Sequence, residues 1–372
     1  MEIQNTLSLL RTRRGISAAR LASEVGVSRQ TVYAIEAGTY VPNTAVSLKM
    51  ARVLEVQVEE IFQLEVPEDD GVKKLEVTLL SDPNELQIGQ SLRLCKVSNK
   101  VVAVPPEPGL WGLPAADAAL ESFHDRSKQS ALVRITRANW DGANRLLIAG
   151  CDPSASLLEH SMQRLGFNLM VSYQNSSRSL ELLKQGLVHI AGTHLVEKSS
   201  GEFNLARVRS VFGNSAVSVF SYAFWEEGIV VATGNPKRIA SIADLARTGI
   251  RIVNREPGAG CRYLLDSLLH DSGIAANRVL GYDQVVRGHL PAARMVHSGE
   301  VDCCISTRAV AQALGLGFVS LVRRPYHLVI RRSSLKLPAV QAFLELLGRT
   351  DFRREIEAST GYDMHSAGEL IR

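Results

Sequence analysis

The stretch AARLASEVGVSRQTVYAIEAG, from Ala18 to Gly38, predicts two short helices joined by a tight turn. In its first half, small and apolar residues recur on one helical face, at Leu21, Ala22 and Val25. Gly26 supplies the turn, and Ser28 is a suitable N-cap for the second helix. We interpret the stretch as a helix-turn-helix, whose second helix enters the major groove of DNA. An ordinary helical hairpin with a solvated polar face is the alternative.

The second helix of this pair turns its polar side chains outward, where they would meet base edges: Arg29, Gln30, Thr31 and Tyr33. Arginine suits guanine, glutamine suits adenine, and a threonine methyl group can contact the thymine methyl group. We expect phosphate contacts from the end of the first helix and from helix N-termini, at Arg13, Arg14, Ser17, Ser28 and Asn43. Because acidic and basic residues nearly balance in this region, a local patch rather than net charge would bind the DNA backbone.

The flanking segments complete a bundle of about five helices, with one helix predicted over residues 2 to 14 and another from Asn43 to Val56. Residues 1 to 64 resemble the phage-repressor-like (Xre) DNA-binding domain in three motifs, Gly26-Val27-Ser28, Ile35-Glu36-Ala37-Gly38 and Pro42-Asn43. The resemblance implies double-stranded operator DNA as a partner and an ion pair between Arg11 and Glu36. We expect the protein to bind the operator as a homodimer or as a higher homo-oligomer.

Length and composition are ordinary for a globular protein of two or three domains: 372 residues, 45% hydrophobic and 22% charged, with a net charge of +4. The sequence has no apolar run of membrane-spanning length and no signal-peptide core at its N-terminus, so we expect a cytoplasmic protein without a membrane partner. Its five cysteines lack CxxC spacing, which predicts no disulfide framework, no metal site and no cofactor. The adjacent Cys303 and Cys304 are interpreted as buried thiols, with redox sensing as the alternative.

The rest of the chain divides by pattern into a linker at 65–75, a small β-rich connector at 76–140 and an α/β region at 141–372. In the connector we predict strands at 77–80, 91–97, 100–104 and 131–135, and a helix from Ala115 to His124. From Arg145 onward strands and helices alternate, which predicts parallel sheet covered by helices in two lobes. At the crossing between the lobes we predict separate strands at 216–225 and 228–234, and in the second lobe a helix at 242–246 and a strand at 279–282. The predicted fold class is multidomain α and α/β, with an all-α helix-turn-helix domain, the β-rich connector and a two-lobed α/β domain.

Polar loops follow the predicted strands of both lobes, where ligands of α/β sheets bind against helix N-termini. The first lobe offers Cys151, Asp152, Ser154, Ser176, Ser177, Arg178, Thr193 and His194. The second lobe offers Arg255, Gly258, Ala259, Gly260, Arg262, Ser306 and Arg308. Arginines and backbone N–H groups at helix starts favour a small anionic ligand.

Residues 145 to 366 resemble the type II periplasmic-binding-protein-like domain that is fused to helix-turn-helix regulators and is similar to molybdate-binding transport proteins. The resemblance rests on AGCDPS, GLVHIAGTHL, SGEFN from Ser200, NREPGAGCR, GEVDCCIS and GLGFVSL. It implies a cleft lined by Ser154, Ser177, Thr193, Arg255, Gly258, Ala259 and Gly260. Relatives carry hydroxyl residues where this chain has Ala259 and Cys261, so an oxyanion such as molybdate, tungstate or sulfate and a small organic acid both stay open as ligands.

Taken together, the sequence predicts a one-component transcriptional regulator that binds operator DNA and a small anion, and not an enzyme. A nucleophile elbow, a P-loop and an HExxH motif are all missing from it. The alternative is a cytoplasmic ligand-binding protein or enzyme on a binding-protein fold, with the helix-turn-helix serving only as an interaction module. For an enzyme, a pair of His194 with Cys151 or Cys261 is the candidate catalytic arrangement.

Overall fold

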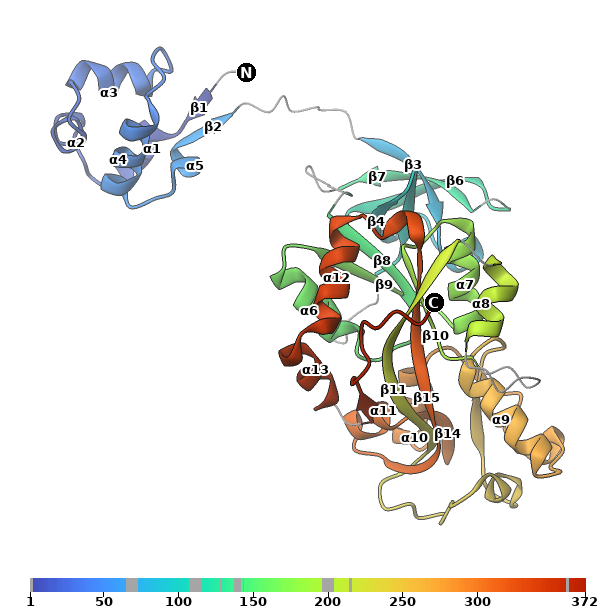
Figure 1. Cartoon of the computed structure of the whole chain (residues 1–372). Helices are drawn as coiled ribbons and strands as arrows, with labels where there is room; N and C mark the ends of the chain where they lie inside the picture. The colour runs from blue at the N-terminus through green and yellow to red at the C-terminus, as the bar shows by residue number, and fades with distance from the viewer. Residues whose placement is uncertain are drawn as a thin grey trace. The chain divides into compact units, whose positions relative to one another are not determined.

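The computed structural model describes residues 3–64, 73–106, 115–127, 129–136, 142, 144–195, 204–213, 216–358 and 361–372. The chain forms two compact units, residues 1–72 and 73–372 (Figure 1). Most of the predicted linker lies outside the described residues, as does the SGEFN motif except for Asn204. The finer domain boundaries stay a prediction.

The first unit consists of five helices and a strand pair. The helices are α1 (Leu7–Arg13), α2 (Ala18–Val25), α3 (Arg29–Glu36), α4 (Thr44–Leu54) and α5 (Val58–Ile61), and the antiparallel strands are β1 (Ile3–Asn5) and β2 (Phe62–Leu64). The prediction of a helix from residue 2 and of an all-α domain is wrong at this end. Pairing of Ile3 with Leu64 takes the first residues into a sheet, so α1 begins only at Leu7.

Local capping fixes the helix-turn-helix as predicted. Gly26 has φ 83° between α2 and α3, a left-handed conformation that glycine adopts without strain. Side-chain oxygens of Ser17, Ser28 and Asn43 accept hydrogen bonds from the third backbone N–H of α2, α3 and α4. The two helices bury Leu21 and Val32 in one core, which leaves Arg29 and Gln30 exposed.

The second unit begins with a closed barrel in the order β3-β5-β4-β6-β7. Its strands are β3 (Lys74–Leu79), β4 (Ser91–Val97), β5 (Lys100–Val104), β6 (Ala118–Asp125) and β7 (Ser130–Ile135). The helix predicted from Ala115 to His124 is wrong, because β6 occupies this segment. Pairing with β4 and β7 and burial of Ala118 and Leu120 inside the barrel override the helix propensity of the segment.

A nine-stranded sheet forms the rest of the second unit, in the order β13-β12-β14-β11-β15-β10-β8-β9, with β16 (Tyr362–Asp363) paired to β11. One lobe contains β8 (Arg145–Gly150), β9 (Asn168–Tyr173) and β10 (Ile190–Thr193), and the other contains β12 (Ile252–Arg255), β13 (Val285–Val286) and β14 (Cys303–Thr307). The strands β11 (Val217–Val231) and β15 (Gly317–Arg331) run through both lobes (Figure 1).

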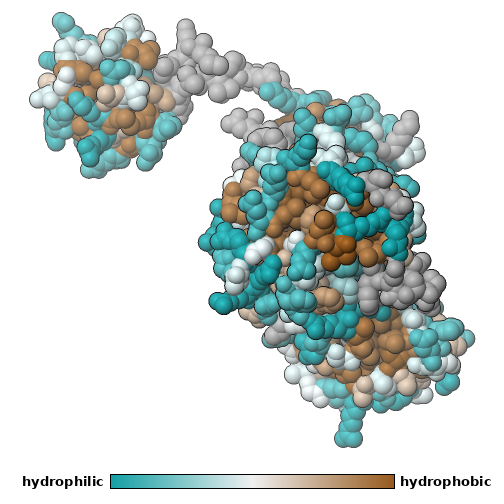
Figure 2. Space-filling model, in the orientation of Figure 1, coloured by the Kyte–Doolittle hydropathy of each residue, from teal (hydrophilic) through white to brown (hydrophobic). Residues whose placement is uncertain are grey.

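Helices cover both lobes. The first lobe carries α6 (Ala155–Arg164), α7 (Ser176–Gln185), α8 (Leu205–Phe212), α12 (Pro338–Gly348) and α13 (Thr350–Glu357). The second carries α9 (Gly260–Asp271), α10 (His289–His297) and α11 (Arg308–Ala313). In the described part of the chain, no helix is both long and apolar enough to cross a membrane. On the face shown in Figure 2, polar residues are spread over both units between smaller apolar patches.

Two sequence predictions in the lobes are wrong. The segments 216–225 and 228–234 were expected as separate strands, but β11 continues through Glu227 and Gly228 with a register shift against β15. A Cβ atom at Gly228 would lie 2.2 Å from the Val319 carbonyl oxygen, so glycine is what allows the two strands to pair closely there. The strand expected at 279–282 is a turn before β13. The helix expected at 242–246 is present over the same residues, Ile242–Ala246, as a 3-10 helix.

Candidate functional site

The loops at the carboxyl ends of the strands meet between the two lobes. Asn175, which caps α7 in the first lobe, donates a hydrogen bond to the Pro257 carbonyl oxygen of the second lobe at 3.3 Å. A Cβ atom at Gly258 would lie 3.3 Å from the Ser177 Cβ, and one at Gly260 would lie 2.7 Å from the His194 ring. Ser177 and His194 of the first lobe therefore lie against Gly258 and Gly260 of the second lobe, and we call this junction the interlobe cleft.

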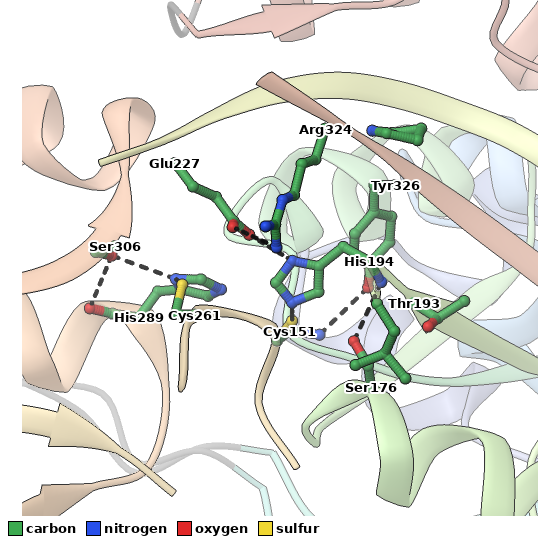
Figure 3. A network of polar contacts seen from close by, with 12 residues as sticks. Cys151, Ser176, Thr193, His194, Glu227, Cys261, His289, Ser306, Arg324 and Tyr326 are labelled. Carbon is green, nitrogen blue, oxygen red and sulfur yellow. Dashed lines mark hydrogen bonds and ion pairs between the residues drawn. The ribbon is translucent and has the colours of Figure 1, made fainter. Parts of the chain in front are cut away.

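Three side chains in contact with one another, Cys151, His194 and Glu227, lie in the middle of this cleft (Figure 3). His194 Nδ1 lies 2.6 Å from Glu227 Oε1, and His194 Nε2 lies 3.5 Å from Cys151 Sγ. All three residues are buried, and the His194 backbone N–H donates to Ser176 Oγ at 3.2 Å. The carboxylate fixes the Nδ1–H tautomer, so the lone pair of Nε2 faces the thiol.

Burial and two nearby arginines, Arg255 and Arg324, influence the charge states of Glu227 and Cys151. Burial alone would raise the pKa of Glu227, but His194, Arg324 and Arg255 together hold that pKa below its usual value. Arg324 Nη1 lies 3.6 Å from Glu227 Oε2. Burial raises the pKa of the Cys151 thiol to about 12, so the thiol is protonated at neutral pH.

A second histidine approaches from the other lobe, at the first position of α10. His289 Nδ1 lies 3.3 Å from Ser306 Oγ and 3.8 Å from Cys261 Sγ, while its buried Nε2 has no hydrogen-bond partner among the described residues. Burial lowers the pKa of His289 well below its usual value, which keeps the imidazole neutral. One ligand atom from each of Cys151, His194 and His289 lies within 4.8 Å of the others.

Asp152 and Ser154 lie beside the cleft but bind each other and two tyrosines. Asp152 accepts hydrogen bonds from the Ser154 backbone N–H at 2.9 Å, from Ser154 Oγ at 2.8 Å and from Tyr362 Oη at 2.6 Å. The Tyr222 hydroxyl lies 2.6 Å from Ser154 Oγ. Burial raises the pKa of Asp152 against these hydrogen bonds. A cavity of about 20 Å³ beside Asp152 has room for one water molecule.

Arg255, at the end of β12, is the most deeply buried of the predicted arginines, with 2% of its side chain exposed. Its Nε and Nη2 donate to the Glu256 carboxylate at 2.9 and 3.2 Å, whereas its buried Nη1 has no partner among the described residues. A buried guanidinium N–H group without an acceptor is costly, so this atom is suited to a ligand oxygen.

Three other predicted arginines bind acidic residues close to them. Arg178 pairs with Glu181 at 3.0 Å, Arg262 pairs with Asp266 at 3.3 Å, and Arg308 pairs with Glu226 at 2.6 Å. The hydroxyl groups of Thr193 and Ser306 are also engaged within the protein. Thr193 Oγ1 donates to Asn204 Oδ1 at 3.1 Å, and Ser306 Oγ donates to the His289 carbonyl oxygen at 3.4 Å. These partners hold the loops in place, and their groups are less available to a ligand than Arg255 Nη1.

In the first unit, the predicted ion pair between Arg11 and Glu36 is confirmed. Arg11 Nε and Nη2 lie 2.6 and 3.3 Å from the Glu36 carboxylate, and Arg11 Nη1 donates to the Ile16 carbonyl oxygen. On the exposed face of α3, Arg29 donates to the Tyr33 hydroxyl at 2.9 Å. Arg14 binds Glu55 at 2.6 Å, which leaves Arg13 as the better candidate for a phosphate contact.

A larger cavity of the second unit lies elsewhere. It measures about 400 Å³, and Arg93, Asp117, Arg145 and Glu159 are among its lining residues. Asp117 and Arg145 form a buried ion pair there, which ties the barrel to β8. The cavity includes none of the predicted ligand residues, so it is not the cleft that the sequence indicates.

Sequence reasoning missed Glu227, His289 and Arg324. Glu227 had a visible signal, because two acidic residues interrupt an otherwise apolar strand at 226–227. His289 starts a helix after Gly288 and gives no such signal, since its partners come from distant parts of the chain. The pair of Cys151 and His194 that the sequence left as a candidate does form.

Both parts of the chain match known protein families. Residues 157–348 match the family described as the PBP superfamily domain, and residues 7–61 match the helix-turn-helix family. The uncharacterized protein YvgK of Bacillus subtilis is 30% identical over 239 residues, which cover 64% of this chain and 77% of YvgK. The uncharacterized HTH-type transcriptional regulator YgzD of the same organism is 43% identical over 63 residues, 17% of this chain and 96% of YgzD.

Solved structures that are similar to part of this chain have low sequence identity to it. The sulfate-binding protein SubI from Mycobacterium tuberculosis is 18% identical with a TM-score of 0.43, and the match covers 59% of this chain and 86% of SubI. Peb3 from Campylobacter jejuni is 17% identical with a TM-score of 0.42, and the match covers 59% of this chain and all of Peb3, at 100%.

Proposed function

This chain belongs to the PBP superfamily and is a helix-turn-helix transcriptional regulator fused to a PBP-like ligand-binding domain, and we propose that a small anion in its interlobe cleft controls its binding to operator DNA. The single observation that carries the proposal is Arg255, whose buried Nη1 has no acceptor among the described residues and lies where loops of both lobes meet. An oxyanion or a small carboxylate would supply that acceptor.

The cleft supports an anion by geometry as well as by charge. The N-terminus of α9 lies next to the cleft, and its N-cap residue, Ala259, has no side chain that could accept a hydrogen bond from the helix N–H groups. Such N–H groups and the helix dipole favour a bound anion. Because Ala259 and Cys261 carry no hydroxyl group, we propose that Arg255 and backbone N–H groups make the main contacts with the anion.

Operator binding is proposed for the exposed face of α3, with a homodimer reading two half-sites. Arg29 and Gln30 are the candidates for base contacts, and Arg13 is a candidate for phosphate. Because this activity needs access to DNA, we propose that the protein works in the cytoplasm. A ligand that binds the closed lobes better than the open lobes would increase the fraction of molecules with closed lobes. In a homodimer, we propose that this closure changes the spacing of the two α3 helices and therefore the affinity for the operator.

The test uses the full chain and an operator obtained by binding-site selection. Molybdate, tungstate, sulfate, phosphate and a set of small dicarboxylates are screened for an increase in melting temperature, since a ligand of the folded state stabilises it. A stabilising anion should change operator affinity in the wild-type protein and not in Arg255→Met. Arg349→Met is the control, because Arg349 binds the exposed Asp351 far from the cleft in sequence. A full response in Arg255→Met contradicts the proposed anion site.

The second candidate function is catalysis by Cys151, His194 and Glu227. Their contacts are those of a nucleophile (Cys151), a base (His194) and a carboxylate that orients the base (Glu227). The raised pKa of Cys151 weighs against it, because the thiolate is the nucleophile. We therefore propose a sensor rather than an enzyme. Trapping of Cys151 by an electrophilic ester at neutral pH, in preference to Cys95, would favour catalysis instead.

A further inference from the structure

We infer that Cys151, His194 and His289 bind one divalent transition-metal ion of the zinc type between the two lobes. The inference deepens the proposed function and rests on it, because the ion would be an effector, or part of the effector, of the same cleft. The spacing of these residues in the sequence gives no sign of the site, since 42 residues or more separate each one from the next.

The distances agree with tetrahedral coordination. With a metal–sulfur bond of about 2.3 Å and a metal–nitrogen bond of about 2.0 Å, sulfur and nitrogen ligands of a tetrahedron lie about 3.5 Å apart. Cys151 Sγ and His194 Nε2 are 3.5 Å apart without any adjustment. The His289 ligand atom is within 4.8 Å of both, so a movement of about 1 Å would complete the set.

Both imidazoles are held in the tautomer that a metal requires. The Nδ1–H group of His194 donates to Glu227, the arrangement by which carboxylates orient metal-binding histidines. Ser306 Oγ donates to the His289 backbone carbonyl, so its lone pairs are free to accept the Nδ1–H group of His289. The remaining nitrogen of His289, Nε2, is buried, has no partner among the described residues and lies on the ring edge that faces Cys151 and His194 (Figure 3).

The donor set selects the class of ion. One thiolate and two imidazoles favour zinc, cobalt, nickel or copper over magnesium and calcium, which prefer oxygen ligands. On binding, the Cys151 S–H bond breaks, the proton leaves to solvent and the sulfur–metal bond forms. The Glu227 carboxylate lies behind His194 and offsets part of the added positive charge. Three protein ligands leave a fourth position open, where a small anion can bind the ion beside Arg255.

The site joins the lobes, so the ion would favour their closure. Cys151 and His194 follow β8 and β10 in the first lobe, whereas His289 begins α10 in the second. Separating the lobes would remove His289 from the ion and lower its affinity. By reciprocal coupling, the ion must then stabilise the closed state by the same factor.

The experiment is a titration of the full chain with Co²⁺, followed by absorption and by equilibrium dialysis. We expect one ion per chain, d–d bands of a tetrahedral site and a thiolate-to-cobalt charge-transfer band. Cys151→Ser should lose the charge-transfer band, and His289→Gln should bind Co²⁺ at least tenfold more weakly. The matched controls are Cys303→Ser, another buried thiol, and His297→Gln, which changes an exposed histidine of the same helix. Both should bind as the wild type does.

A wild-type protein without the charge-transfer band, or a band that persists in Cys151→Ser, overturns the proposal. A measurement that needs no variant is X-ray absorption of the zinc-loaded chain, where we expect one sulfur and two imidazole nitrogens, and an oxygen-only shell overturns the site. Operator binding separates this proposal from the proposed function. If Zn²⁺ binds with the expected ligands but the chain selects no DNA sequence, the metal site stands and the regulator function fails.

Discussion

A Cβ atom at Gly260 would lie 2.7 Å from His194 Nε2, so the first turn of α9 can approach the end of β10 only because residue 260 has no side chain. The contact joins the two lobes at the candidate site. Adding one methyl group at Gly260 therefore tests whether the stability of the second unit depends on this contact between the lobes.

Gly260→Ala should destabilise the second unit by roughly 1–3 kcal/mol, because the methyl group overpacks the ring of a buried histidine. Gly348→Ala is the matched control, since a Cβ atom there meets nothing within 4 Å, and it should change stability by less than about 0.5 kcal/mol. Urea denaturation followed by tryptophan fluorescence at the buried Trp225 measures both. Equal midpoints for the two variants would show that the lobes do not need this contact.

The ion pair of Arg11 and Glu36 should couple the two residues energetically. With 15% and 9% of their side chains exposed, removal of either leaves a charge poorly solvated. Each single alanine variant should therefore cost roughly 1–3 kcal/mol, and the double variant less than their sum. Hydrogen exchange of the amides of α1 and α3 measures the cycle. The exposed pair of Arg14 and Glu55 is the comparison and should show a coupling below about 1 kcal/mol. Additive costs for Arg11 and Glu36 would rule out the coupling.

The proposed DNA contacts separate into two kinds. Arg29→Ala and Gln30→Ala should each cost roughly 1–3 kcal/mol on the selected operator and relax the sequence preference, because they remove base contacts. Arg13→Ala should weaken all duplexes alike and reduce the salt dependence by about one counterion. Binding-site selection and salt titrations distinguish the two. Unchanged specificity in Arg29→Ala would remove this residue from the base-reading face.

Acidification should destabilise the second unit through its buried histidines. Burial lowers the pKa of His189 and of His327 to about 4, whereas the unfolded chain titrates near 6.5. Between these values the unfolded state binds protons that the folded state does not, so stability falls as the pH drops below 6.5. The loss for each histidine should be roughly 2 kcal/mol between pH 7 and pH 5.

Urea denaturation at several pH values checks this dependence. His327→Gln should flatten the pH profile by the contribution of one histidine, and the exposed His270→Gln should leave it unchanged. If stability is the same at pH 5 and pH 7, the buried histidines are not the neutral groups that we describe.

Local signals made the helix-turn-helix and most helices predictable. Capping residues such as Ser28 and the turn at Gly26 act within a few positions, and the structure has them as expected. The strand β6 was mistaken for a helix because its partners, β4 and β7, lie elsewhere in the chain. Non-local pairing decides such segments, and a single sequence does not display it.

The candidate site was predictable in its outline and not in its chemistry. The rule that ligands bind at the carboxyl ends of strands selects Cys151, His194 and Arg255 as candidates. It did not find that acidic partners would occupy Arg178, Arg262 and Arg308, because those contacts depend on how the loops pack. His289 was missed for the same reason.

The continuous strands β11 and β15 have a mechanical consequence. A pair of hydrogen-bonded strands resists separation but can bend, and one of the two register shifts of β11 against β15 lies between Glu227 and Gly228. Glu227 is also the residue that holds His194. If the strands bend at this register shift when the lobes open, the Glu227 carboxylate would move away from the His194 imidazole. The contact between these two side chains would then depend on whether the cleft is filled.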